Sequence, residues 1–149
     1  MKLKSILLMF CLFLLANISY SQKKKDDPQS IIVDGVAIKK YHTISELEGL
    51  QKGELLTLYT ERIESLVKVL PYIAFATKPG VTMSTLGIPN NNDNKKALEE
   101  QHEASDNFLE TTSEFHGIIL PYSDTSKLIS AILFYEEIFK LLHEYGDFN

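Results

Sequence analysis

Apolar residues return every three or four positions in three long stretches of this sequence, the spacing of helices that each bury one face. The stretches run from about residue 54 to 70, from 94 to about 116, and from 123 or 124 to 146. Three helices of similar length with two connections predict an all-α fold, an antiparallel three-helix bundle. A capping box at Thr43 and Glu46, or alternatively at Ser45 and Glu48, adds a short helix, so a four-helix version of the bundle stays open.

Proline and glycine positions limit these helices. Pro71 falls inside the first pattern and must end or kink that helix, and the continuing apolar phase favours a kink. Asn94 is the predicted cap of the second helix, and Gly117 and Pro121 close it. Residues 77–94 form a long irregular connection, of a length that is uncommon unless functional or disordered. The third helix has the widest apolar stripe and is expected to be central, whereas the second offers a narrower, more polar seam.

A β-hairpin is predicted over residues 31–38, before the helices. Apolar runs at 31–33 and 36–38 are joined by Asp34-Gly35, and Asp-Gly is a strong signal for a two-residue turn between strands. A lone hairpin is marginal in water, so it must pack on the domain or on a partner's sheet edge.

The first 21 residues are typical of a cleaved secretory signal. Two lysines precede an unbroken apolar run of 11 residues, 6–16, and Ser19 and Ser21 supply small side chains before a cleavage site ahead of Gln22. A membrane-spanning helix needs ~20 apolar residues, so an uncleaved anchor is disfavoured. We expect an exported protein, periplasmic or extracellular, with no membrane span after cleavage. The expected organisation is a signal peptide at 1–21, a flexible leader at 22–30 and a single helical domain at 31–149.

Cleavage would remove the single cysteine, Cys11, and change the formal net charge from −5 to −7 because Lys2 and Lys4 leave with it. Lipidation of Cys11 is the alternative, but Phe10 stands where a small residue is expected. A thiol-free mature chain excludes disulfides, thiolate metal sites and thiol catalysis. Nucleic acid is not an expected partner, because phosphate binding needs clustered cations and the chain has one arginine, Arg62.

Glu99 and His102 are the best metal candidates, because di-iron bundles use Glu-x-x-His pairs. The second pair is missing, since Ser113 stands three residues before His116. His102 and His116 fall on similar faces of the helix, yet two imidazoles are fewer than the three protein ligands of a catalytic zinc. A solvated acidic face is the favoured interpretation, and no cofactor is expected.

Nothing in the sequence frames a catalytic nucleophile or a phosphate loop. The serines lack the Gly-x-Ser-x-Gly turn, and the glycines are scattered. Adjacent carboxylates such as Glu136 and Glu137 diverge by ~100° around a helix, so solvation explains them better than acid–base chemistry.

Tyrosines are the remaining signal for a site. Tyr59, Tyr72, Tyr122 and Tyr135 lie on or beside apolar faces, where a buried phenol needs a hydrogen-bond partner. Tyr72 and Tyr122 each close a Leu-Pro-Tyr sequence, which indicates two helix ends built alike and not a duplication. Core packing is the ordinary explanation, and a pocket or partner surface near these ends is the functional one.

The leading hypothesis is an exported helical module that binds another protein or an envelope component without catalysis. The alternative is a metal-binding helical bundle or an enzyme that uses Glu99, His102 and His116.

Overall fold

The computed structural model describes residues 28–36 and 38–146, and this part of the chain is all-α. Its α-helices are α2 (Ile44–Glu48), α3 (Lys52–Val69), α4 (Asn92–Ile119) and α5 (Thr125–Gly146), and its 3-10 turns are η1 (Leu70–Tyr72), η2 (Ser84–Leu86) and η3 (Leu120–Tyr122). The predicted all-α class is confirmed for these residues, with three main helices packed together. The predicted signal peptide lies outside them, as does most of the predicted leader.

Polar caps set where the helices begin. At α2 the Glu46 carboxylate accepts the Thr43 backbone N–H at 2.8 Å, and the Thr43 hydroxyl accepts the Glu46 N–H at 3.3 Å, which is the predicted capping box. At α4 the cap is Asn91 and not the predicted Asn94, because the Asn91 side-chain oxygen accepts the Asn94 N–H at 2.8 Å. The helix therefore starts three residues earlier than a cap at Asn94 would place it.

Pro71 ends α3, and the kink favoured from the sequence is wrong. The α-helix stops at Val69, and the chain tightens into η1 because proline has no N–H to continue the ladder. The second Leu-Pro-Tyr forms η3 directly after α4. The interpretation of two helix ends built alike is confirmed.

The predicted hairpin over residues 31–38 is wrong, because the described residues contain no β-strand there. Asp34-Gly35 does turn, with Gly35 at φ 86°, but its described flanks, 31–33, 36 and 38, do not pair with each other. The segment instead meets the α3–α4 connection, where Ile31 N–H donates to Val81 O at 2.8 Å beside an isolated bridge from Ser30 to Thr82. Burial of apolar side chains from this segment in the core is more favourable than an isolated two-stranded ribbon.

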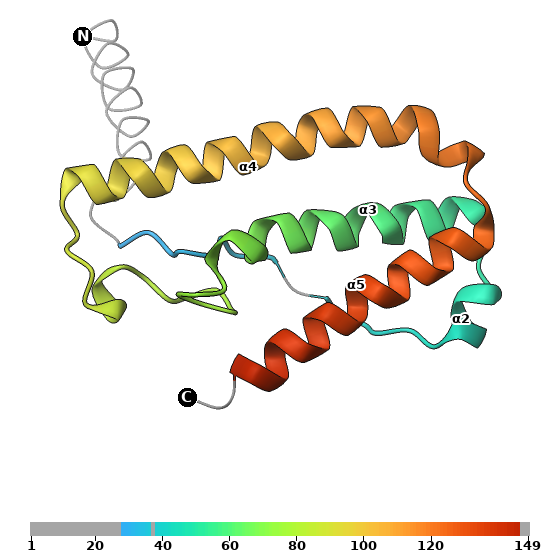
Figure 1. The fold of residues 1–149 in the computed structure, drawn as a ribbon, viewed down its shortest axis with the longest axis horizontal. Helices are drawn as coiled ribbons and strands as arrows, with labels where there is room; N and C mark the ends of the chain where they lie inside the picture. The colour runs from blue at the N-terminus through green and yellow to red at the C-terminus, as the bar shows by residue number, and fades with distance from the viewer. Residues whose placement is uncertain (1–27, 37, 147–149) are drawn as a thin grey trace, which may run out of the picture.

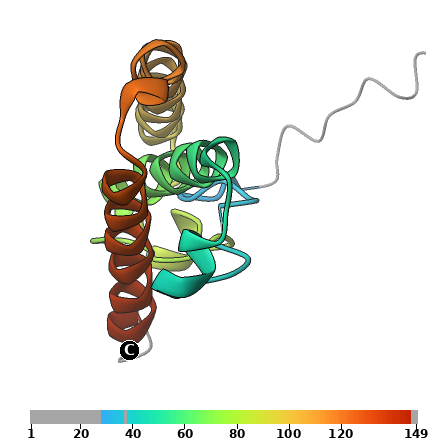
Figure 2. The same ribbon diagram turned by 90° about the vertical axis from the view of Figure 1, so that its right-hand side faces the viewer.

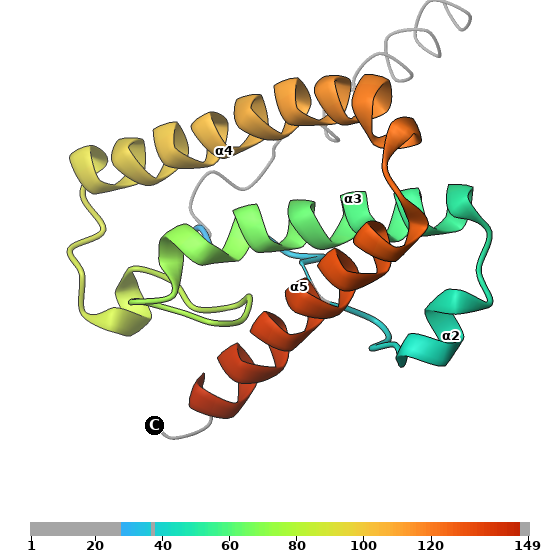
Figure 3. The same cartoon turned by 45° about the vertical axis from the view of Figure 1, so that its right-hand side comes forward.

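α3 is the central helix, packing against α4 on one side and α5 on the other. α3 and α4 lie alongside each other with opposite chain directions, and α5 crosses α3 obliquely (Figures 1 and 3). Seen from the end, α4 and α5 occupy different sides of α3 (Figure 2). The expectation that the third helix is central is wrong, because α2 and the N-terminal segment cover part of the wide apolar stripe of α5.

Two clusters make up the core, and α3 contributes to both. One comprises Ile31, Ile32, Val36, Leu66, Val69, Tyr72, Ala76 and Phe139. The other comprises Leu47, Leu55, Leu128, Ile129 and Ile132. By contrast α4 buries a single described residue, Ser105, in agreement with its narrow and polar seam. Most of the surface of α4 is therefore left exposed.

Candidate functional site

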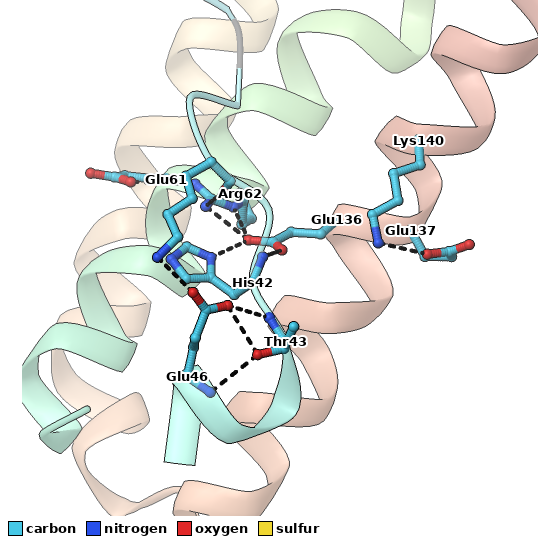
Figure 4. Close-up of polar contacts among 9 residues, drawn as sticks. His42, Thr43, Glu46, Glu61, Arg62, Glu136, Glu137 and Lys140 are labelled. Atoms are coloured by element: carbon cyan, nitrogen blue, oxygen red, sulfur yellow. Dashed lines mark hydrogen bonds and ion pairs between the residues drawn. The ribbon is translucent and has the colours of Figure 1, made fainter. Parts of the chain in front are cut away.

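A buried ion pair joins α3 to α5. Glu136 is 1% exposed and Arg62 is 4% exposed. The Arg62 guanidinium donates from Nε at 3.0 Å and from Nη2 at 2.8 Å, both to Glu136 Oε1 (Figure 4). A buried carboxylate needs such a partner, because desolvation of an unpaired charge is very unfavourable.

The segment before α2 completes this cluster. His42 donates its backbone N–H to Glu136 Oε2 at 2.6 Å and its Nδ1–H to Oε1 at 2.8 Å, while Arg62 Nη2 donates to Lys40 O at 3.0 Å. Glu136, Arg62, His42 and the Lys40 carbonyl are therefore joined in one hydrogen-bonded network. The cluster fastens the extended chain at residues 40–42 to both α3 and α5 (Figure 4).

The protonation of Glu136 follows from these contacts. Burial raises the pKa of the carboxyl, but the hydrogen bonds from His42 and Arg62 outweigh it and hold the pKa below its ordinary value. Both carboxylate oxygens are occupied by protein donors. A saturated carboxylate that is kept ionised is suited to holding the fold and poorly suited to transferring a proton.

The sequence interpretation of Glu136 was wrong, and its neighbour Glu137 shows why. Only Glu137 is solvated, pairing with Lys140 at 3.2 Å on the surface. Glu136 instead shares the phase of Ile132 and Phe139, and Arg62 shares the phase of the buried leucines of α3. The signal in the sequence for a buried ion pair was that Arg62 and Glu136, which have opposite charges, each lie within the apolar stripe of a helix.

Three aromatic side chains meet where the main helices approach one another. The Tyr59 ring lies 5.6 Å from that of Tyr135 on α5 and 5.4 Å from that of His116 on α4. Burial and the neighbouring Tyr59 hydroxyl raise the pKa of Tyr135 to about 12, and burial lowers the pKa of His116. Two of the predicted tyrosines thus lie together as a packing cluster.

The other two predicted tyrosines separate. Tyr122 is 86% exposed, whereas Tyr72 is 5% exposed and packs edge-on against His102 at 5.5 Å. Burial raises the pKa of Tyr72, and the nearby Ser105 side chain lowers that pKa by a smaller amount. No described protein group meets the Tyr72 hydroxyl in hydrogen-bond geometry. That oxygen has less than 1 Å² exposed, so a molecule in the neighbouring hollow of about 260 Å³ would not touch it.

His102 is occupied by the N-terminal segment. Its Nε2 lies 2.9 Å from Ile31 O, which can only accept, and its Nδ1 lies 3.1 Å from the Gln29 side-chain amide, which donates. His116 stands 14 residues further along α4, about 21 Å at 1.5 Å per residue. The structure therefore does not bring the histidines together, and the described residues include no group of three or more His, Cys, Asp or Glu side chains able to hold a metal ion.

An exposed apolar stripe follows α4 into η3, and Tyr122 is the one member of it that was predicted as a binding candidate. Phe108, Phe115, Ile118, Ile119 and Tyr122 are each between 46% and 86% exposed. Their spacing places them on one flank of the helix, beside the seam that meets α3. A shorter exposed row on α5 consists of Phe134, Leu141 and Tyr145. The signal in the sequence was a second row of large apolar residues in this helix, beside the row that packs on α3.

The size of the stripe distinguishes it from scattered surface side chains. An aromatic side chain carries about 150–250 Å², so these five residues expose on the order of 500 Å² of apolar surface. Patches of roughly this size are the largest found on typical monomers and often mark interaction sites. We call Phe108, Phe115, Ile118, Ile119 and Tyr122 the α4 stripe.

No protein-family model, no curated protein and no solved structure matches this chain. Within residues 28–36 and 38–146, no helix has the length and apolarity needed to cross a membrane.

Proposed function

We propose that this chain is an exported helical module that binds another protein through the α4 stripe and performs no catalysis. The observation that carries the proposal is the burial pattern of α4, whose 28 residues include one buried side chain and an exposed row of large apolar side chains. A helix packed on one side only, with a second apolar flank, has room for another helix. A partner helix along α4 would complete a four-helix arrangement around the described fold.

The polar groups support a binding role over a catalytic one. Glu136 and Arg62 are saturated by each other and by the segment at residues 40–42. His102 is saturated by Ile31 and Gln29. These groups fix the three-helix scaffold that presents the stripe.

Site-directed photocrosslinking tests the proposal. A photoreactive residue at Thr111, which is exposed between Phe108 and Phe115, should form a defined adduct in the cells that produce the protein. The same residue at Ser45, exposed on α2, is the matched control and should give none. Equal adducts from both positions, or none from Thr111, would reject the α4 stripe as the binding surface.

A further inference from the structure

Carboxylates follow one edge of α4, beside the α4 stripe and ahead of it. Glu114 lies one helical turn before Ile118 and flanks the apolar row. Glu103 and Glu100 lie on the same side of the helix, five and eight residues before Phe108. Glu100 has Lys96 at 3.4 Å, whereas neither Glu103 nor Glu114 has a cation of the described residues within ion-pair distance.

This edge belongs to a strongly acidic helix. α4 carries seven acidic residues and two lysines, so its formal charge is −5. A second copy of the chain docked by its own stripe would bring the same carboxylates together, because a two-fold interface places each patch on itself. An acidic partner or a nucleic acid would meet the same repulsion. Complementarity therefore calls for a basic partner.

The shape of the stripe indicates the partner's secondary structure. From Phe108 to Ile119 the row runs for about 17 Å along α4, and Tyr122 follows it in η3. Amphipathic helices bind such surfaces with anchors at three- and four-residue spacing. We infer that the α4 stripe takes an amphipathic helix of a partner protein whose apolar face is flanked by lysine or arginine. This inference rests on the proposed function, since it names the class of partner for the same surface.

Binding of two synthetic helical peptides to the full mature chain tests the partner's chemistry. Both peptides carry leucine along one face; one has lysine on the flanks and the other has glutamate. We expect the lysine peptide to bind at least tenfold more tightly than the glutamate peptide. Its affinity should fall at least tenfold in Phe108→Ala/Phe115→Ala, and severalfold in the triple variant Glu100→Gln/Glu103→Gln/Glu114→Gln.

A second triple variant controls for general attraction to an acidic protein. Asp34→Asn/Glu48→Gln/Glu144→Gln removes the same charge from exposed positions on other elements. It should bind the lysine peptide as tightly as the unmodified chain. Equal binding of both peptides, or equal loss in the two triple variants, would overturn the inference. Crosslinking from Thr111 would still decide the proposed function, because that readout does not depend on the partner's charge.

Discussion

Arg62 donates two hydrogen bonds to a single oxygen of Glu136, and this buried contact ties the central helix to α5. The pair is shielded from water, and the other carboxylate oxygen holds the backbone of His42. Three segments distant in the sequence therefore depend on one carboxylate. The fold that presents α4 is stabilised at this point.

Glu136→Gln should be strongly destabilising. It leaves the buried Arg62 charge with only the exposed Glu61 carboxylate, at 3.4 Å, as a counterion among the described residues, and breaking a buried pair costs about 3–5 kcal/mol. Glu137→Gln is the matched control, since it changes the same chemical group one residue away at an exposed position and should alter the free energy of unfolding by less than about 0.5 kcal/mol. Urea unfolding of both variants measures the difference, and equal effects would contradict the assigned role of Glu136.

Stability should depend on pH through the same carboxyl. The folded pKa of Glu136 lies below its ordinary value of 4.5, so its contribution is complete above about pH 4.5 and is lost as pH falls through the lowered folded pKa. The free energy of unfolding should therefore decline below about pH 4.5 more steeply in the unmodified chain than in Glu136→Gln. Parallel pH profiles for the two proteins would show that Glu136 is not the group responsible.

The helices were largely predictable from the sequence because their signals are local. Thr43 with Glu46 marks the start of α2 through neighbouring residues, and the apolar spacing gives the buried faces. The absence of a hairpin at 31–38 was not predictable. The Asp-Gly turn is a local signal, whereas the competing burial of Ile32 against α3 and α5 depends on the assembled core.

The candidate sites were less predictable than the helices. The Glu136–Arg62 pair joins residues 74 positions apart, and no local pattern states which charges share an interior. Tyr72 and Tyr122 occupy the same local motif, yet one is buried and the other exposed. That difference arises from the presence of the N-terminal segment beside η1, which the motif itself does not encode.

The two Leu-Pro-Tyr tyrosines should respond differently to substitution. Tyr72→Ala opens a cavity in the core and should cost about 3–5 kcal/mol, by comparison with other large aromatic truncations, whereas Tyr122→Ala should change the free energy of unfolding by less than about 0.5 kcal/mol. Thermal or urea unfolding of the two variants makes the comparison. Similar losses in both would contradict the difference in burial.

Tyr72→Phe isolates the hydroxyl. Because that oxygen is buried with no described protein partner in hydrogen-bond geometry, its removal should leave the free energy of unfolding unchanged or raise it. Urea unfolding against the unmodified chain measures the effect. A loss above about 1 kcal/mol would mean that the hydroxyl makes a bond in solution.

Binding through the α4 stripe is decided by the affinity of the purified Thr111-crosslinked partner for Phe115→Ala, compared with its affinity for Ile44→Ala. Both residues are more than half exposed, so neither change should unfold the protein, but only Phe115 belongs to the α4 stripe. We expect that Phe115→Ala weakens binding by about tenfold or more, as is usual for an aromatic interface anchor, while Ile44→Ala binds normally. Unchanged affinity in Phe115→Ala would contradict binding through the α4 stripe.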